Sequence, residues 1–370
     1  KFGAKTMSRS QKCEQCDERK IAALVEIDGN AKYFCRICTE AVQEQHPTES
    51  LCEQCHEGRT INTLVVDNKP LTLCETCLKE MDDGKSKKKD KKAKKDKSSK
   101  RPSEGAGPGY GIGEQQGRRP TMEDAETAIP DLSVEFGDYC ATPSAFYGVY
   151  DGHGGQRAAE FVKNTLHHKI IATDKFKNDD IEGAIKDGYL NTDNELLKMC
   201  DAEDWTDGCT AVVGLIHKGK LWTSCVGDSE LVVSVDGVAQ CRSFKHKPTD
   251  PGERARIQAA GGVVLFDRLG ASMAVSRSFG DKVHKNPFNG APADHMSCDP
   301  FIDSMDIDGV EFLIIACDGL WDTVEYQQAV DFVAKKRKKG KSPSETAEAI
   351  VQEALDRGSN DNVTAIIVYL

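Results

Sequence analysis

Carboxylate side chains recur where apolar segments end in the C-terminal part of the sequence. A single aspartate after a strand is usually a turn residue or a helix cap, but several here are bounded by glycine or asparagine. Clustered carboxylates repel one another, so a shared site requires raised pKa values or a cation, and hard oxygen ligands favour Mg²⁺ or Mn²⁺. The positions are Glu123 and Asp124 in RRPTMEDA, Asp151 in VYDGHGG, Asp228 in CVGDSE, Asp318 and Asp322 in LIIACDGLWD, and Asp361 in GSNDNVT.

The stretch FYGVYDGHGG, residues 146–155, adds an imidazole to this pattern. Its apolar residues indicate a buried strand, and Asp151 and His153 follow with glycine between and after them. A histidine beside a carboxylate can act as a general acid or base. Taken without the surrounding motifs, His153 is first interpreted as a buried structural histidine.

Eight cysteines in residues 13–77 form two patterns of identical spacing. Each pattern has two Cys-x2-Cys pairs separated by eighteen residues, and each cysteine of the second lies 39 positions after its counterpart in the first. This internal duplication has the spacing of a four-thiolate zinc site. Two disulfides per unit are the alternative, which the lack of an export signal disfavours. The predicted ligands are Cys13, Cys16, Cys35 and Cys38, and then Cys52, Cys55, Cys74 and Cys77.

A zinc ion would replace the hydrophobic core that so small a unit lacks, because structural zinc contributes roughly 10–16 kcal/mol of apparent binding free energy. IAALVEIDG and INTLVVDN are predicted strands between the cysteine pairs. The units loosely resemble half of a B-box or a zinc-ribbon knuckle, without the second ligand set of a B-box. That resemblance implies a module that binds protein or, less often, nucleic acid. Few aromatic residues lie among the basic ones, so the stacking platform of a single-strand binder is missing.

A strongly basic segment divides the chain. Residues 85–101 hold ten lysines, one arginine and two aspartates, which is +9, so the rest carries −20 of the net charge of −11. Such a segment is predicted to be disordered. No apolar run approaches the length of a membrane span, and the cytosol or nucleus is the expected location. The expected organisation is a first zinc unit at 10–45, a second at 49–83, a linker at 84–108 and a globular domain at 109–370.

The globular part alternates predicted strands and helices. Residues 209–217 and 220–227 are predicted strands joined by a tight turn at Lys218-Gly219, and residues 230–237 are predicted to continue the meander. Short turns between neighbouring strands imply antiparallel pairing. Residues 342–358 predict a helix with Ser342 as N-cap, Glu345 completing a capping box, and Gly358 ending it.

The motifs RRPTMEDA, FYGVYDGHGG, DGCTAVVG, VGDS, AVSRSFGD, ACDGLWD and GSNDNVT occur in the order found in the metal-dependent PP2C/PPM serine/threonine phosphatases. The resemblance covers about residues 109–370. It implies an α+β fold, a β-sandwich of two antiparallel sheets flanked by helices with the metals at one end. In this chain two small zinc-binding units would precede that fold.

The resemblance also implies a role for each residue in a centre of two, and at most three, Mg²⁺ or Mn²⁺ ions. Asp151 would bridge two metals with the Gly152 carbonyl beside it, and His153 would be the general acid for the leaving alkoxide. A two-metal centre lowers the pKa of bound water to about 7 and clamps an in-line displacement. The other implied positions are Asp318 and Asp361 on the second metal, Glu123 and Asp124 acting through water, Asp228 and Asp322 at a weaker third site, and Arg119, with Arg118 as the alternative register, on the substrate phosphate.

The sequence departs from the family pattern at three places. The usual GDSR is GDSE at 227–230, the usual DHKP is KHKP at 245–248, and residues 282–300 form a divergent flap. If the chain is extended after Gly227, Glu230 points to the same side as Asp228 and adds an acid near the third metal site. If the turn rotates it, Glu230 faces solvent. The sequence leaves both outcomes open.

Three functions are compatible with these features. The leading one is an active phosphatase of phosphoprotein substrates, recruited by a protein partner of the zinc units. The first alternative is a pseudophosphatase scaffold, although no core ligand is missing. The second is an adaptor in which the zinc units bind protein or nucleic acid, while the lysine tract is either a nucleic-acid contact or a solvated linker.

Overall fold

The structure is a computed structural model, which describes residues 109–140, 144–288, 290–291 and 293–370, together with the backbone of four strands nearer the N-terminus. The contacts divide the chain into two compact units, residues 1–99 and 100–370. Each unit is described by itself. None of the described helices is long and apolar enough to cross a membrane.

The first unit contains two antiparallel hairpins at equivalent places of the sequence duplication. Strand β1 (Ile21–Ile27) pairs with β2 (Asn30–Cys35), and β3 (Asn62–Val66) pairs with β4 (Lys69–Leu73). The strands predicted in IAALVEIDG and INTLVVDN are therefore confirmed. The eight cysteine side chains and the predicted linker at 84–108 lie outside the described residues.

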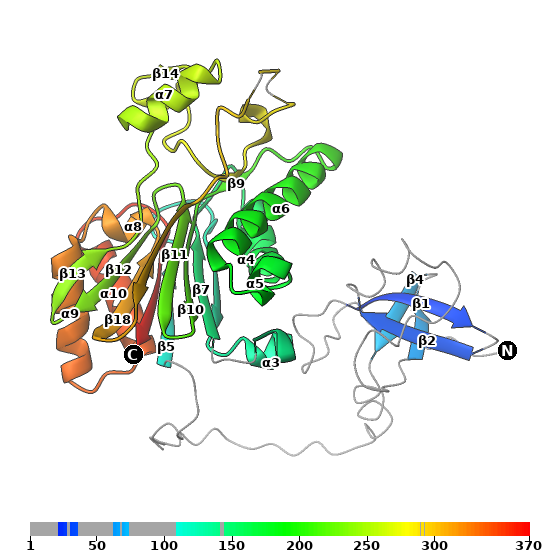
Figure 1. Cartoon of the computed structure of the whole chain (residues 1–370), viewed down its shortest axis with the longest axis horizontal. Coiled ribbons are helices and arrows are strands. Elements are labelled where there is room, and N and C mark those ends of the chain that lie inside the picture. The colour runs from blue at the N-terminus through cyan, green and yellow to red at the C-terminus, as the bar shows by residue number, and fades with distance from the viewer. Residues whose placement is uncertain are drawn as a thin grey trace. The chain divides into compact units, whose positions relative to one another are not determined.

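The second unit is a sandwich of two five-stranded antiparallel sheets (Figure 1). Their facing sides bury a common core that includes Tyr147, Leu231 and Leu313. The first sheet has the order β17 (Phe301–Asp306), β11 (Lys220–Val226), β10 (Ala211–His217), β7 (Ser144–Tyr150) and β6 (Ala125–Ile129). The second has the order β13 (Val238–Cys241), β12 (Glu230–Val235), β18 (Val310–Ala316), β19 (Val363–Tyr369) and β5 (Gly109–Gln115).

Helices cover both outer faces of the sandwich. Apolar side chains of α4 (Arg157–Ile171) and α6 (Ile181–Ala202) share a core with the first sheet, and those of α9 (Tyr326–Lys338) and α10 (Pro343–Asp356) share one with the second. The fold predicted by the family resemblance is thus confirmed for this unit. The shorter helices are α3 (Ser133–Phe136), η1 (Gly137–Cys140), α5 (Asp174–Lys177), α7 (Pro251–Ala259), η2 (Lys282–His284) and α8 (Asp318–Trp321). The shorter strands are β8 (Gly152–His153), β9 (Gly208–Cys209), β14 (Val264–Leu265), β15 (Arg268–Leu269) and β16 (Phe279–Gly280).

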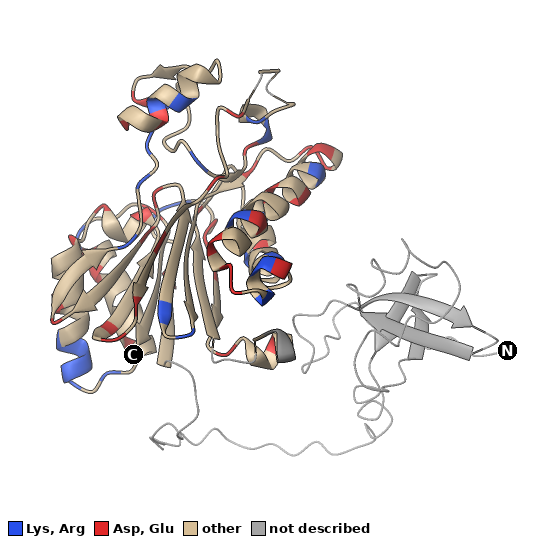
Figure 2. Cartoon of the chain, in the orientation of Figure 1, with Lys and Arg blue, Asp and Glu red and all other residues tan. Residues whose placement is uncertain are grey.

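Two helices show how the sequence sets their ends. In α10 the Ser342 side chain accepts from the Glu345 amide, and the Glu345 side chain accepts from the Ser342 amide, so the predicted capping box is confirmed. Gly358 follows with a φ of 98°. The last turn of α9 carries four basic residues, Lys335 to Lys338 (Figure 2). Positive charge there is favourable beside the carbonyl end of the helix dipole.

The connection after β11 differs from the sequence prediction. The turn at Lys218-Gly219 joins β10 and β11 as expected, but β12 does not continue the meander. It lies in the second sheet, between β13 and β18, because β17 occupies the free edge of β11. Gly227, with a φ of 94°, redirects the chain. This crossing places Asp228 at the end of the sandwich, between the two sheets.

Candidate metal centre and active site

Three of the predicted acids meet at one end of the sandwich. Asp151 follows β7, Asp228 follows β11, and Asp318 begins α8 directly after the end of β18. One carboxylate oxygen from each lies within 4.8 Å of the others. The antiparallel strands therefore bring together three acids that are far apart in the sequence.

The protein environment disfavours the charged form of two of these acids, Asp151 and Asp318, when no cation is present. Burial, and then the charges of Asp124 and Asp318, raises the pKa of Asp151 well above its ordinary value. Burial and the charge of Asp228, then those of Asp322 and Asp361, raise the pKa of Asp318 to about 7. A bound cation would favour the charged form of these buried, mutually repelling carboxylates, and their oxygen ligands fit Mg²⁺ or Mn²⁺.

The remaining predicted acids surround this cluster. Burial raises the pKa of Asp124 to about 6, although Thr364 donates a 2.7 Å hydrogen bond to it. Glu123 accepts a 2.9 Å hydrogen bond from Thr121. The charges of Asp322 and Asp361 contribute to the raised pKa of Asp318, as stated above. The structure therefore places the predicted acids around one end of the sandwich.

Gly152 has a steric reason to lack a side chain. A Cβ atom at this position would lie 2.2 Å from the backbone oxygen of Glu123. Glycine therefore lets the loop that carries Glu123 approach the strand end that carries Asp151. Asn362 holds the same loop: its side chain accepts from the Glu123 amide at 2.9 Å and donates to the carbonyls of Gln116 and Thr121. Sequence reasoning did not assign this role, although Asn362 lies in the motif GSNDNVT.

Arg119 is the arginine that reaches the acids. Its Nη2 donates to Asp361 Oδ2 at 2.7 Å, and its side chain is 57% exposed, so the guanidinium stays accessible to a ligand. Arg118 instead donates to Asn360 at 3.1 Å. The geometry favours Arg119 over the alternative register.

His153 is held by an aspartate that sequence reasoning did not assign. Its Nε2 lies 2.8 Å from Asp281 Oδ2, and Ser278 also donates to that oxygen. Burial opposes protonation of His153, but the charge of Asp281 and the hydrogen bond to it outweigh burial, so the pKa of His153 is raised. Asp281 is the last residue of the motif AVSRSFGD, which was the available signal.

A buried ion pair supports the turn that carries Asp281. Lys285, which is fully buried, lies 2.6 Å from Asp193 on α6 and also donates to the Ser278 carbonyl at 2.8 Å. Asp193 accepts from the Gly280 amide as well. Lys285 belongs to the divergent flap sequence, so this part of the flap is anchored to α6.

Two of the three departures from the family motifs, Glu230 and Lys245, meet in space. Glu230 is 2% exposed, and its Oε1 lies 2.9 Å from Lys245 Nζ. Lys247, two residues after Lys245, forms an ion pair with Asp228, two residues before Glu230. Tyr326 donates to the other carboxylate oxygen of Glu230. The alternative that Glu230 faces solvent is therefore wrong. Glu230 points to the same side as Asp228, but its carboxylate contacts Lys245 and Tyr326 rather than the acids of the cluster.

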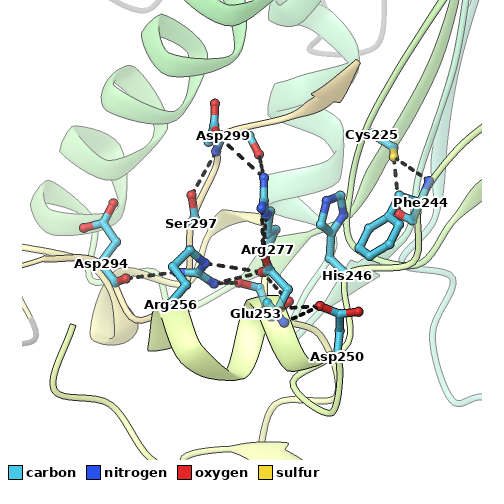
Figure 3. Close-up of polar contacts among 12 residues, drawn as sticks. Cys225, Phe244, His246, Asp250, Glu253, Arg256, Arg277, Asp294, Ser297 and Asp299 are labelled. Atoms are coloured by element: carbon cyan, nitrogen blue, oxygen red, sulfur yellow. Dashed lines mark hydrogen bonds and ion pairs between the residues drawn. The ribbon is translucent and has the colours of Figure 1, made fainter. Parts of the chain in front are cut away.

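A second buried network joins α7 to the end of the flap (Figure 3). Glu253 accepts two hydrogen bonds from Arg277, at 2.6 and 3.1 Å, and two from Arg256, at 3.1 and 3.3 Å. Arg277 also donates to the Asp299 carbonyl at 2.6 Å, and Arg256 donates to the Asp294 carbonyl at 3.2 Å. One carboxylate thus holds both arginines in place, and the arginines bind the backbone of the flap at Asp294 and Asp299.

Replacing Glu253 with glutamine should destabilise the second unit by on the order of 3 kcal/mol at pH 7. Burial would raise the pKa of Glu253, but the hydrogen bonds from Arg277, Ser276 and Arg256 lower it to about 2. A lowered pKa gives stability that is present above the ordinary value of 4.5 and is lost as the pH falls toward 2. Urea midpoints at pH 7 and pH 3 measure this, with the exposed Glu348→Gln as the control. Equal midpoints for parent and Glu253→Gln at pH 7 would contradict the assignment.

Comparison with known proteins agrees with this geometry. A sequence profile of protein phosphatase 2C matches residues 109–363. Protein phosphatase 2C homolog 2 of Aspergillus flavus is 38% identical over 273 residues, which is 70% of this chain and 63% of the relative. Protein spalten of Dictyostelium discoideum is 37% identical over 70% of this chain and 27% of its own length. The chain thus spans less than two thirds of the length of these curated relatives.

A solved structure shows the same fold. The crystal structure of serine-threonine phosphatase 2C from Toxoplasma gondii superposes with a TM-score of 0.60 at 25% identity, covering 71% of this chain and 97% of that one. The profile match covers more than half of the chain and includes every acid of the cluster. From its sequence, its fold and its acidic site, the chain belongs to the protein phosphatase 2C family.

Proposed function

We propose that residues 109–370 hydrolyse phosphoserine and phosphothreonine in proteins, with Mg²⁺ or Mn²⁺ as cofactor. The observation that carries this proposal is the group of Asp151, Asp228 and Asp318, whose carboxylate oxygens lie within 4.8 Å of one another at one end of the sandwich. Burial of Asp151 and Asp318 beside other acids raises the pKa of both and is unfavourable for their charged forms unless a cation binds there. Family membership supports the same conclusion.

The residues of the chain would divide the work as follows. Asp151, Asp318, Asp361 and the Gly152 carbonyl would hold two cations, with Glu123 and Asp124 further out and with Asp228 and Asp322 at a third position. When bound, the two cations make water a stronger nucleophile and neutralise charge on the transferred phosphoryl group. Arg119 would orient the phosphate, because its guanidinium lies beside Asp361 and is exposed.

His153 would supply the proton that the leaving group needs. Attack by water forms a new P–O bond while the bond between phosphorus and the serine or threonine oxygen breaks, so the departing alkoxide must gain a proton. Asp281 occupies Nε2 of His153, which leaves Nδ1 to carry that proton. Proton donation of this kind contributes typically 10²–10⁴ in rate.

Phosphate release by the full chain from a phosphothreonine peptide and an aryl phosphate tests the proposal. Release should require Mn²⁺ or Mg²⁺ and stop when EDTA is added. The competing pseudophosphatase function is less well supported, because all the acids of the family motifs are present. A folded protein that releases no phosphate from either substrate in millimolar Mn²⁺ would establish that alternative.

We further propose that residues 13–77 bind two structural zinc ions and recruit a protein partner. The support is the duplicated cysteine spacing, together with the β1–β2 and β3–β4 hairpins, which fall between the cysteine pairs of each unit.

A fragment of residues 1–83 should therefore contain two zinc ions per chain, and chelation should unfold it, because a unit of this size lacks a sufficient core. Metal analysis and circular dichroism measure both outcomes. Removing the fragment from the full chain should leave hydrolysis of an aryl phosphate nearly unchanged. A fragment that stays folded without metal would refute the structural role of zinc.

A further inference from the structure

A second group of metal-ligand side chains lies on the helical side of the first sheet. Glu135 of α3 faces two consecutive histidines of α4, with Oε1 at 3.3 Å from His168 Nε2 and 3.9 Å from His167 Nε2. The two imidazole centroids are 4.2 Å apart. Among the described residues, this trio and the trio of Asp151, Asp228 and Asp318 are the groups whose ligand atoms lie within 4.8 Å of one another.

The trio is remote from the proposed active site. The segment before α3 is tied to the start of β7 by a 2.8 Å hydrogen bond from the Leu132 amide to the Ser144 carbonyl. Asp151 follows the other end of β7, seven residues along the strand. At about 3.4 Å per residue the two groups are roughly 20 Å apart. A ligand of the trio would therefore not take part in phosphate hydrolysis.

His167 is the observation that points to a ligand. Its side chain is 7% exposed, and Phe136 and Phe146 lie against its ring. The ring has a hydrogen bond with the backbone of Lys163 on the same helix, but its Nε2, at 3.9 Å from Glu135 Oε1, is too far from that carboxylate for a hydrogen bond. Leaving this nitrogen of a buried ring without a hydrogen bond costs free energy.

An ordinary ion pair does not account for the position of His167. Nε2 of His168 lies 3.3 Å from Glu135 Oε1, whereas Nε2 of His167 lies 3.9 Å from the same oxygen, beyond hydrogen-bond distance. A cation between the three residues would contact all of them, because one ligand atom of each lies within 4.8 Å of the others.

We propose that Glu135, His167 and His168 bind one Zn²⁺ ion. Two imidazole nitrogens and one carboxylate oxygen form a borderline donor set that suits zinc better than Mg²⁺. Zinc lies 2.0–2.2 Å from such atoms, which places tetrahedral ligands about 3.3 Å apart. The two nitrogens lie 3.3 and 3.9 Å from Glu135 Oε1, so these two separations already approach that value. Water can complete the coordination, because the side chains of His168 and Glu135 are 41% and 36% exposed.

Zinc binding by the full chain tests this proposal independently of phosphatase activity. Bound zinc per chain is measured by equilibrium dialysis over a series of buffered free Zn²⁺ concentrations, with excess Mg²⁺ present. The parent should bind one more zinc ion than His168→Gln. Glu135→Gln should weaken that same step by about tenfold or more, because the loss of even an outer-shell partner typically costs about 10–100-fold in metal affinity. Zinc at other sites of the chain is common to all variants and cancels in the comparison.

The matched control is Glu195→Gln. Glu195 is a similarly exposed carboxylate paired with α4, at 2.6 Å from Lys169, but it lies outside the trio. It should bind zinc as the parent does. Identical binding curves for the parent, His168→Gln and Glu135→Gln would overturn the proposal and leave the trio as an ion pair. If His168→Gln does not fold by circular dichroism, the exposed Glu135→Gln alone decides the result.

Discussion

Replacing Asp318 with asparagine should abolish phosphate release and yet stabilise the metal-free protein. The activity should fall by at least about 10²-fold, because metal charge stabilisation is worth several kcal/mol of the barrier. The stability gain follows from the pKa of Asp318, which burial and neighbouring acids raise from 3.8 to about 7. An acid with a raised pKa stabilises the fold fully below 3.8, and that contribution is lost as the pH rises through about 7. Asparagine cannot ionise, so the variant does not lose this stability at high pH.

Thermal unfolding in EDTA at pH 8, together with phosphate release in Mn²⁺, measures both effects. The expected stability gain is on the order of a few kcal/mol, and it should shrink at pH 4, where Asp318 is protonated in the parent as well. The exposed Asp331→Asn on α9 serves as the control and should change neither quantity. Near-parental activity of Asp318→Asn in Mn²⁺ would remove this residue from the metal centre.

Replacing Glu230 with arginine should lower the free energy of unfolding by about 3–5 kcal/mol, which is the usual effect of removing one partner of a buried ion pair. The new guanidinium would lie beside Lys245, and the Tyr326 hydroxyl would lose its acceptor. The family pattern has arginine at the position of Glu230 and aspartate at that of Lys245. Because Glu230 and Lys245 form an ion pair, we interpret these two departures as a single exchange of charge between paired residues.

A double-mutant cycle in urea tests this interpretation. Glu230→Arg and Lys245→Asp should each destabilise the protein, whereas the combined variant should be more stable than their sum predicts by at least about 2 kcal/mol. The pair Arg242 and Asp303, which are 2.6 Å apart, offers a control exchange elsewhere on the sheets. Strictly additive effects of the Glu230 and Lys245 substitutions would show that the two side chains are not coupled.

The strands and the acids of the site could be predicted from the sequence because both are local signals. Apolar runs such as residues 311–317 indicate β18, and the residue types that follow the runs indicate the acids. The path of β12 could not be predicted in this way. A meander and a crossing to the second sheet have the same local pattern, and the choice depends on β17, which pairs with β11 from about 75 residues further along the chain.

The partners of Glu230 and His153 could not be predicted for a related reason. The alternation of side chains along a strand correctly places Glu230 on the side of Asp228. It does not indicate that Lys245, from another segment, lies beside Glu230. Asp281 lies 128 residues from His153, and only the fold shows that they meet. Burial of Lys285 runs against the usual preference of lysine for solvent, and it depends on Asp193 being present on α6.

The central proposal is that the acids at the strand ends would hold two cations, with Asp151 shared between them. The electron paramagnetic resonance spectrum of the full chain with Mn²⁺ tests it most directly, because two manganese ions that share a carboxylate are magnetically coupled and give a spectrum distinct from that of isolated ions. The parent should show a coupled pair, and Asp151→Asn should lose the coupling. A parent spectrum of isolated Mn²⁺ alone, unchanged by Asp151→Asn, would contradict the account.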